Sequence, residues 1–213
     1  MSVRPDEPPG VAPSSWLDEA RRKAIHIGCL LLPLGMLYEW LPWPRGKAEW
    51  RWFSIALALT ALLIDLVRIH ERRVQRLFRD FFGGMIREHE RFNLLGSTYL
   101  LIAAWLALEM FPQPVAAASL GFAVLGDGIA GLAGRTFGRT RFFGKTLEGA
   151  AAGLAACLAW AAFVAWSGHL TWNVALAGAL VASLVEFLPI PLDDNLGVPL
   201  VSGYVMKLLG MPT

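Results

Sequence analysis

Seven apolar stretches, several of them close to the length that crosses a bilayer, recur along this chain of 213 residues. A transmembrane helix needs roughly 20 predominantly apolar residues, and a chain with 55% hydrophobic residues is too apolar for an ordinary soluble domain. The third and fourth stretches are separated only by Pro112-Gln113-Pro114. We therefore predict an all-α, polytopic integral membrane bundle whose spans cover residues 24–42, 50–68, 95–111, 115–134, 148–167, 172–189 and 198–210.

The N-terminal region differs in composition from the rest of the chain. Its first 15 residues contain four prolines and no apolar run, which predicts a disordered tail over residues 1–17. Residues 18–213 are then expected to form a single transmembrane domain, and we expect no signal peptide before the first span. Cys29 and Cys157 both fall inside predicted spans, so we expect neither a disulfide nor a cysteine metal ligand.

The distribution of basic residues predicts the orientation. Seven spans with the N-terminus inside would place 15 of the 19 Lys and Arg residues in or beside segments 1–23, 69–94 and 135–147. Cytoplasmic loops of membrane proteins carry such an excess. We predict a cytoplasmic N-terminus, with an active site facing the cytoplasm of what we expect to be a bacterial inner (plasma) membrane.

Residues 71–90 combine apolar side chains at nearly helical spacing with arginines and glutamates on the other face. The pattern predicts an amphipathic helix in the membrane interface, with its cations on lipid phosphates. Gly83-Gly84 would bend or interrupt that helix. The alternative is a solvated, positively charged loop with no binding role.

Residues 126–149 gather glycines, cations and carboxylates between two apolar stretches. Glycine lets backbone N–H groups approach a ligand, and Arg and Lys neutralise phosphate. Thr146 is expected to cap the N-terminus of the next helix, where free N–H groups favour anions. A Walker-type loop is excluded because five residues, where that motif has four, separate Gly138 from Gly144. The candidate phosphate-binding residues are Arg135, Arg139, Gly144, Lys145 and Thr146.

Acidic residues at the ends of the predicted spans collect on one side. Ionisable groups in or beside a membrane are costly, which makes them functional candidates. Glu39 and Glu109 fall near the opposite face, and we expect them to reach its interface. The acids expected at the cytoplasmic face are Asp65, Asp127, Glu148, Glu186, Asp193 and Asp194.

Two further features bear on the chemistry. Asp193-Asp194-Asn195 follows a rigid Pro-Ile-Pro turn, and its oxygen-bearing side chains suit a hard cation such as Mg²⁺. His26 and Lys23 lie at the cytoplasmic end of the first span. His26 is interpreted either as structural or as part of the site.

Taken in order, these motifs make residues 18–210 resemble the CTP-dependent polyprenol and lipid-alcohol kinases, which include dolichol kinase, phytol kinase and CTP-dependent diacylglycerol kinase. The matching pieces are Arg22-Lys23-Ala24-Ile25-His26, Asp65-Leu66-Val67-Arg68, His89-Glu90-Arg91, Gly96-Ser97-Thr98-Tyr99, Gly126-Asp127-Gly128, Gly134-Arg135-Thr136-Phe137-Gly138, Gly144-Lys145-Thr146-Leu147-Glu148-Gly149, Glu186, Asp193-Asp194-Asn195-Leu196 and Pro199-Leu200. The resemblance includes the candidates Lys23, Asp65 and Glu186 and brings in Arg68 beside them, and it alone implies CTP as the phosphoryl donor.

Two other functions stay open. Phosphatidate cytidylyltransferases share an intramembrane Asp, a G-R-x-F-G stretch and a K-T-x-E-G. Here, however, Phe142-Phe143-Gly144 replaces their Ser-Pro-x-Lys, and Asp193-Asp194-Asn195 stands where their basic signature would lie. A small transporter would have charged groups across the bilayer and an internal repeat, and this sequence shows acids at one face and no repeat.

The expected reaction transfers the γ-phosphate of CTP to the hydroxyl of a membrane lipid alcohol. Asp127 with Asp193, Asp194 and Asn195 would hold Mg²⁺. Lys145 and the arginines would bind phosphate, and either Glu148 or Asp127 would orient or deprotonate the hydroxyl. We expect a nucleotide, a lipid alcohol and the bilayer as partners, and no nucleic acid. Glycines such as Gly121, Gly128, Gly131 and Gly134 permit close helix contacts, within the bundle or in a homodimer.

Overall fold

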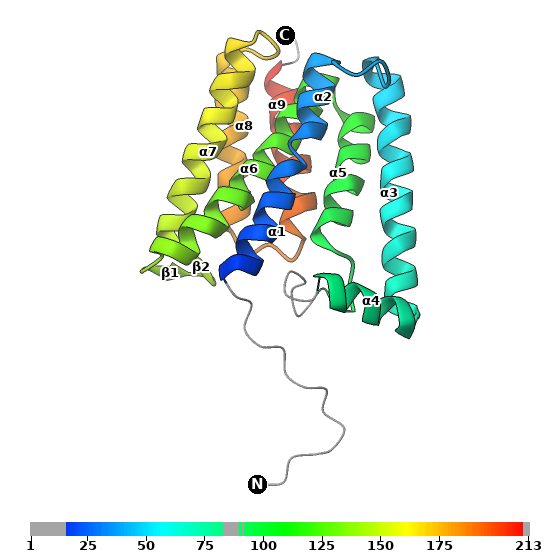
Figure 1. Ribbon diagram of the computed structural model, residues 1–213. Coiled ribbons are helices and arrows are strands. Elements are labelled where there is room, and N and C mark those ends of the chain that lie inside the picture. The colour runs from blue at the N-terminus through cyan, green and yellow to red at the C-terminus, as the bar shows by residue number, and fades with distance from the viewer. Residues whose placement is uncertain (1–15, 83–89, 91, 211–213) are drawn as a thin grey trace.

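The computed structural model describes residues 16–82, 90 and 92–210 and confirms the all-α class (Figure 1). Within these residues, nine helices are accompanied by one short hairpin, which the sequence did not predict. The elements are α1 (Trp16–Gly28), α2 (Leu31–Tyr38), α3 (Gly46–His70), α4 (Arg72–Phe82), α5 (Gly96–Met110), α6 (Gln113–Phe137), β1 (Arg141–Phe142), β2 (Lys145–Thr146), α7 (Leu147–Trp166), α8 (Trp172–Phe187) and α9 (Asp194–Gly210).

The predicted spans overlap these helices in order, and the first span is divided between α1 and α2. Pro33 lies in the first turn of α2 and has no N–H to donate to the carbonyl of Cys29. Around the break, Leu30 and Leu32 donate instead to carbonyls three residues earlier, at 2.9 and 3.1 Å. The two helices therefore meet at a tight turn, which the apolar composition of the sequence concealed.

By length and composition, α3, α6 and α7 could each cross a membrane. Residues 24–38, α5 and α8 form shorter apolar helices. The chain therefore has the composition of an integral membrane protein, while seven spans and a cytoplasmic N-terminus stay predictions.

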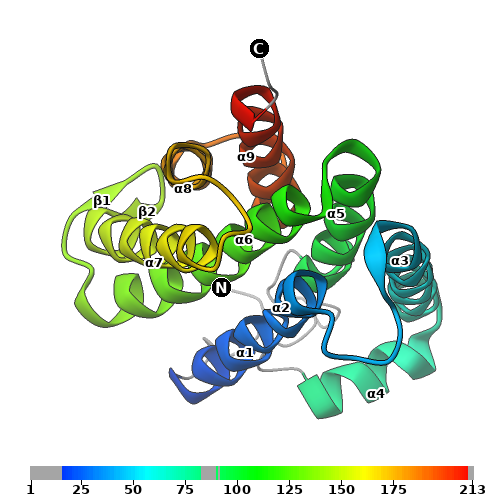
Figure 2. The same cartoon turned by 90° about the horizontal axis from the view of Figure 1, so that it is seen from above.

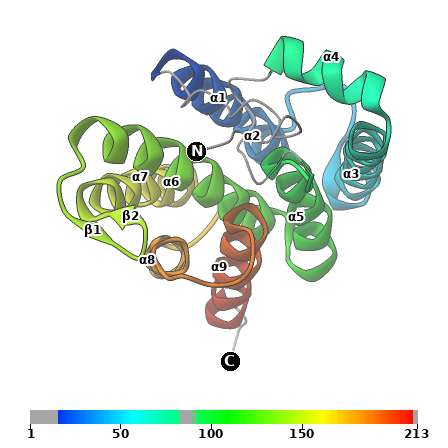
Figure 3. The same ribbon diagram turned by 90° about the horizontal axis from the view of Figure 1, so that it is seen from below.

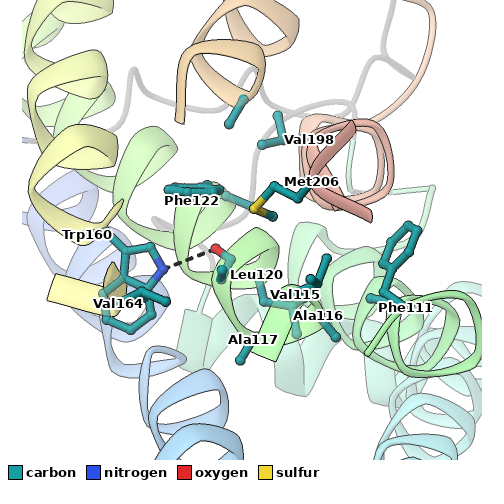
Figure 4. Close-up of a cluster of buried hydrophobic side chains, with 14 of the residues drawn as sticks. Phe111, Val115, Ala116, Ala117, Leu120, Phe122, Trp160, Val164, Val198 and Met206 are labelled. Atoms are coloured by element: carbon teal, nitrogen blue, oxygen red, sulfur yellow. Dashed lines mark hydrogen bonds between the residues drawn. The ribbon is translucent and has the colours of Figure 1, made fainter. Parts of the chain in front are cut away.

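Helix α6 lies at the centre of the bundle and contacts α1, α2, α5, α7, α8 and α9 (Figure 2). Every residue from Val115 to Val124 is buried, which accounts for the absence of a charged face in this part of the helix. Around it, Phe111, Phe122, Trp160 and Met206 fill the core (Figure 4). The indole N–H of Trp160 donates to the carbonyl of Ala118 at 3.0 Å, so this buried polar group is satisfied.

Two of the glycines predicted to permit close contacts face other helices of the same bundle. A Cβ at Gly121 would collide with the indole of Trp160 on α7, and one at Gly128 would lie 3.0 Å from Ile27 on α1. Both positions are therefore used inside the bundle. The homodimer stays a prediction.

One end of the bundle holds the start of α1, the hairpin, α4 and the connection from α8 to α9 (Figures 1 and 3). The connections from α2 to α3 and from α7 to α8 lie at the other end. The segments predicted to share the cytoplasmic side thus share one end of the molecule. Helix α4 covers 72–82 of the predicted amphipathic helix and lies across the end of α3. Residues 83–89 of the predicted amphipathic helix, which include Gly83-Gly84, lie outside the described residues.

Candidate functional site

A cavity of about 410 Å³ lies at the end of the bundle where α6 ends and α7 begins. Its wall comes from α1, α6, the hairpin, α7, α8 and the first residue of α9. Cationic and acidic side chains from separate parts of the sequence meet there. They are Arg22, Arg135, Arg141 and Lys145 on the one hand, and Asp127, Glu186 and Asp194 on the other.

The hairpin brings Lys145 to this cavity. Strands β1 and β2 pair antiparallel, with Arg141 opposite Thr146 and Phe142 opposite Lys145. The two residues at the tip, Phe143 and Gly144, have φ of 50° and 81°. Positive φ at both tip positions is the geometry of the tight turn whose twist matches two paired strands. Gly144 is therefore required by the turn itself, in addition to lining the cavity.

Close packing of α6 against α7 sets the position of the cavity wall. A Cβ at Gly149 would lie 2.7 Å from the carbonyl of Ala130 and 3.0 Å from the Cα of Gly134. Only glycine permits this separation between the two backbones. The predicted N-cap is confirmed, because the Thr146 hydroxyl accepts a hydrogen bond from the Gly149 N–H at 3.2 Å.

Lys145 links the hairpin to two helices of the cavity wall. Its ammonium group lies 2.7 Å from Oδ2 of Asp194 and also donates to the backbone carbonyl of Glu186. One side chain from the hairpin therefore contacts the end of α8 and the beginning of α9. Lys145 and Asp194 are each 36% exposed, so a ligand in the cavity can reach both.

The remaining predicted cations are placed differently. Arg135 lines the cavity, whereas Arg139 is exposed and is not among the residues that form the wall. The side chain of Lys23 lies outside the described residues. Arg22 and Arg141 also line the cavity, although neither was among the predicted phosphate-binding residues. For Arg141 the missed signal was the short hairpin, which turns its strand toward the site.

Asp127 lies in the last part of α6 and lines the cavity. Its Oδ2 atom is 3.5 Å from Nε2 of His26 on α1. Both side chains are largely shielded, with 24% and 13% exposed. The structure thus brings together two candidates from α1 and α6, although His26 itself is not among the described residues that line either cavity.

A second cavity of about 190 Å³ adjoins the first and shares Asp127, Lys145 and Asp194 with it. Asp193 and Asn195 complete the polar part of its wall. The Oδ1 atom of Asp193 accepts hydrogen bonds from the backbone N–H and the side-chain amide of Asn195, at 2.9 and 3.0 Å. Asp193 therefore caps the start of α9 while lining the cavity.

Asp194 is on the N-terminal side of the span predicted over residues 198–210, outside the predicted membrane segment. Burial raises the pKa of its carboxyl group, and the ammonium of Lys145 acts in the opposite direction. The carboxylates of Asp127 and Asp193 raise that pKa further. A concentration of negative charge at this point favours a cation as partner.

Within the described part of the chain, no group of three or more His, Cys, Asp or Glu side chains is arranged to hold a metal ion. Mg²⁺ usually binds through one or two carboxylates, together with water and the phosphates of a substrate. The carboxylates of Asp127, Asp193 and Asp194 on one cavity fit that mode. They do not form a cage made of protein ligands alone.

Glu148, a predicted catalytic residue, contacts the loop that precedes the hairpin. Its carboxylate accepts hydrogen bonds from the backbone N–H of Arg139 at 3.1 Å and of Thr140 at 3.2 Å. Glu148 is not among the described residues that line either cavity. In this structure it stabilises the chain where it enters the hairpin.

Glu186 lines the larger cavity from the last turn of α8 and is 9% exposed. A Cβ at Gly126 would lie 2.8 Å from its Oε2 atom. The glycine before Asp127 thus makes room for this carboxylate. Asp65 and Arg68 are buried elsewhere, near the start of α5, and are not among the described residues that line either cavity.

Neither a protein-family model nor a solved structure matches this chain. It is 25% identical over 161 residues to CTP-dependent diacylglycerol kinase 1 of Schizosaccharomyces pombe, an alignment that covers 68% of this chain and 74% of that protein. The chain is distantly similar to a CTP-dependent lipid kinase. This similarity suggests a kinase with CTP as donor and a lipid as acceptor.

Proposed function

We propose that the protein is an integral membrane kinase that transfers the γ-phosphate of CTP to the hydroxyl of a membrane lipid alcohol. The observation that carries this proposal is the cavity at one end of an apolar bundle, where, among the described residues, four cationic and three acidic side chains meet. Phosphoryl transfer depends mainly on positioning and charge neutralisation, and this is the set of groups it requires. The similarity to a CTP-dependent diacylglycerol kinase supports the same reaction class.

The phosphates of CTP would lie among Lys145, Arg135, Arg141 and Arg22. Backbone N–H groups at the start of α7, beside Gly144 and Thr146, favour negative charge at the same place. When a phosphate occupies the cavity, Lys145 can contact it instead of Asp194, which leaves the aspartate available to a cation. Arg139 is exposed near the hairpin and would act from the rim.

Asp193 and Asp194, with the neighbouring Asn195, are the residues that would hold Mg²⁺ together with the phosphates. Bound there, the ion would neutralise charge that develops on the phosphate oxygens. Asp127 faces the same cavity from α6. We assign it to the acceptor, because one carboxylate serves poorly as both metal ligand and base.

Asp127 would orient the lipid hydroxyl and accept its proton, with His26 beside it. The hydroxyl oxygen forms a bond to the γ-phosphorus, the bond from that phosphorus to the bridging oxygen breaks, and CDP leaves. We prefer Asp127 to Glu148 in this role, because backbone hydrogen bonds hold Glu148 away from the cavity wall.

The acceptor would reach the site from the bilayer. Ala150, Leu154 and Phe187 make part of the wall apolar, so a hydrocarbon chain can lie beside the charged groups. Diacylglycerol is the first acceptor to test, since the similar protein is named for it. Polyprenol, dolichol and phytol also end in a primary hydroxyl and are the next candidates.

The deciding experiment incubates the purified protein in detergent with Mg²⁺, γ-labelled CTP or ATP, and each of these lipids in turn. Label in the lipid fraction would support the proposal and identify both donor and acceptor. No label there, with transfer of CMP from α-labelled CTP to phosphatidate, would identify a cytidylyltransferase and refute the proposal.

A further inference from the structure

Asp65 and Arg68 form a buried ion pair near the end of α3. The Nε atom of Arg68 lies 2.9 Å from Oδ1 of Asp65, and each residue is 1% exposed. An ion pair so fully removed from water is costly unless further hydrogen bonds satisfy both groups. Those additional bonds show what the pair does.

Four hydrogen bonds between described residues link the pair to the segment that leads into α5 and to the first turn of α5. Arg68 donates through its other two nitrogens to the backbone carbonyls of Glu90 at 3.0 Å and Asn93 at 2.6 Å. The Oδ2 atom of Asp65 accepts from the backbone N–H of Leu95 at 2.8 Å and from the hydroxyl of Thr98 at 2.7 Å. The ion pair therefore holds this segment in place against α3.

The same interactions cap α5 from outside. Leu95 occupies its N-cap position and has no side chain that could accept a hydrogen bond. The carboxylate of Asp65 takes the Leu95 N–H, and the carboxylate of Glu90 takes the Gly96 N–H at 3.1 Å. Two anions at a helix N-terminus also interact favourably with its dipole. The position of Gly96 is thus fixed from two sides.

Gly96 is in turn packed against the start of α9. A Cβ at this position would lie 2.9 Å from the amide nitrogen of Asn195 and 3.4 Å from Oε1 of Glu90. Asn195 is buried, and that same amide nitrogen donates to Asp193. A displacement of Asn195 would therefore change the orientation of a carboxylate in the smaller cavity.

We propose that Asp65, Arg68 and Thr98 are positioning residues, which fix Gly96 against Asn195 and thereby orient the carboxylate of Asp193 toward a divalent cation. The assignment of that cation rests on the proposed function. Partners in the outer shell of a metal site typically change metal affinity by roughly 10- to 100-fold when they are altered. The three residues act through Asn195 and Asp193 without contacting substrate.

The test compares Gly96→Ala with Gly210→Ala in the purified full chain. Gly210 is the last residue of α9, the helix that carries Asn195 at its start, and a Cβ there would have its nearest atom, on Val174, at an ordinary 3.9 Å. We expect Gly96→Ala to raise the Mg²⁺ concentration for half-maximal lipid phosphorylation by about tenfold. Gly210→Ala should leave it unchanged.

A second measurement does not depend on activity. The N–H groups of Leu196 and Gly197 donate to the backbone carbonyl of Asp193 at 2.9 and 2.8 Å. Their hydrogen exchange should be faster in Gly96→Ala and unaffected in Gly210→Ala. An unchanged exchange rate, or faster exchange with an unchanged Mg²⁺ dependence, would overturn the inference.

A matched pair at Thr98 covers the case in which Gly96→Ala fails to fold. Thr98→Val keeps the shape but loses the hydroxyl bonded to Asp65, whereas Thr98→Ser keeps that hydroxyl. We expect faster exchange and a higher Mg²⁺ requirement in Thr98→Val, and near wild-type values in Thr98→Ser. Equal values in the two variants would refute the positioning role. Wild-type protein that phosphorylates no lipid would instead refute the proposed function, and the exchange rates would still decide the positioning.

Discussion

The ammonium group of Lys145 lies 2.7 Å from Oδ2 of Asp194 and also donates to the backbone carbonyl of Glu186. These contacts join three parts of the chain, because the hairpin, α8 and α9 each contribute one of the groups. The cation is thus already inside the cavity before any phosphate binds. Such preorganisation reduces the entropy that binding would otherwise cost.

Lys145→Met should weaken CTP binding. Hydrogen bonds to charged groups contribute about 1.5–3 kcal/mol, so we expect the KM for CTP to rise by roughly 10- to 100-fold. Lys207→Met is the matched control, since Lys207 donates to the carbonyl of Met110 at the opposite end of the bundle. Steady-state kinetics at saturating lipid would measure both. Equal KM values for the two variants would contradict the phosphate-binding role.

Asp127→Asn should lower kcat and have little effect on the KM for CTP. General-base groups contribute roughly 10²- to 10⁴-fold to the rate, and an amide cannot accept the hydroxyl proton. Glu109→Gln is the control, because Glu109 lies in a half-exposed pair 3.7 Å from Arg51 at the other end of the bundle, where such pairs contribute little. A wild-type kcat in correctly folded Asp127→Asn would remove Asp127 from the mechanism.

Much of the fold could be predicted because apolar length and periodicity are local properties of the sequence. The separation of α5 from α6 follows from Pro112-Gln113-Pro114, and the cap at Thr146 from its residue type. The division between α1 and α2 was harder to predict, because Pro33 lies in an otherwise continuous apolar run. The hairpin has strands of only two residues each, too short for any periodicity to appear.

The sequence could predict the site only as a set of residues at one face of the membrane, without their contacts. Asp127 and Lys145 stood out in the sequence, and the structure places both at the cavity. Their partners could not be predicted, because the pairing of Lys145 with Asp194 depends on how α7, α8 and α9 pack. The separation of Glu148 from the cavity likewise depends on hydrogen bonds to a loop.

Gly149→Ala should destabilise the protein. Its Cβ would meet backbone atoms of Ala130 and Gly134, at 2.7 and 3.0 Å, and backbone cannot move aside as a flexible side chain can. Overpacking of this kind costs about 1–3 kcal/mol. Thermal unfolding in detergent would measure the effect against Gly28→Ala, where no neighbouring atom lies within 4 Å. A melting temperature at or above that of the control would show that α6 and α7 can separate without cost.

The predicted orientation can be tested with two single-cysteine variants in a background with Cys29→Ala and Cys157→Ala. Phe142 is exposed on the hairpin, and Thr171 is exposed in the connection between α7 and α8, where its side chain makes no capping hydrogen bond. A membrane-impermeant maleimide added to intact cells should label Thr171→Cys. Phe142→Cys should react only after the membrane is opened.

Quantitative labelling after solubilisation would show that both cysteines are reactive. The reverse pattern in intact cells would place the hairpin and its cavity outside the cytoplasm, away from the cellular supply of CTP. Because Arg135, Arg141 and Lys145 would then face a compartment without nucleotide, that result would overturn both the orientation and the proposed kinase activity.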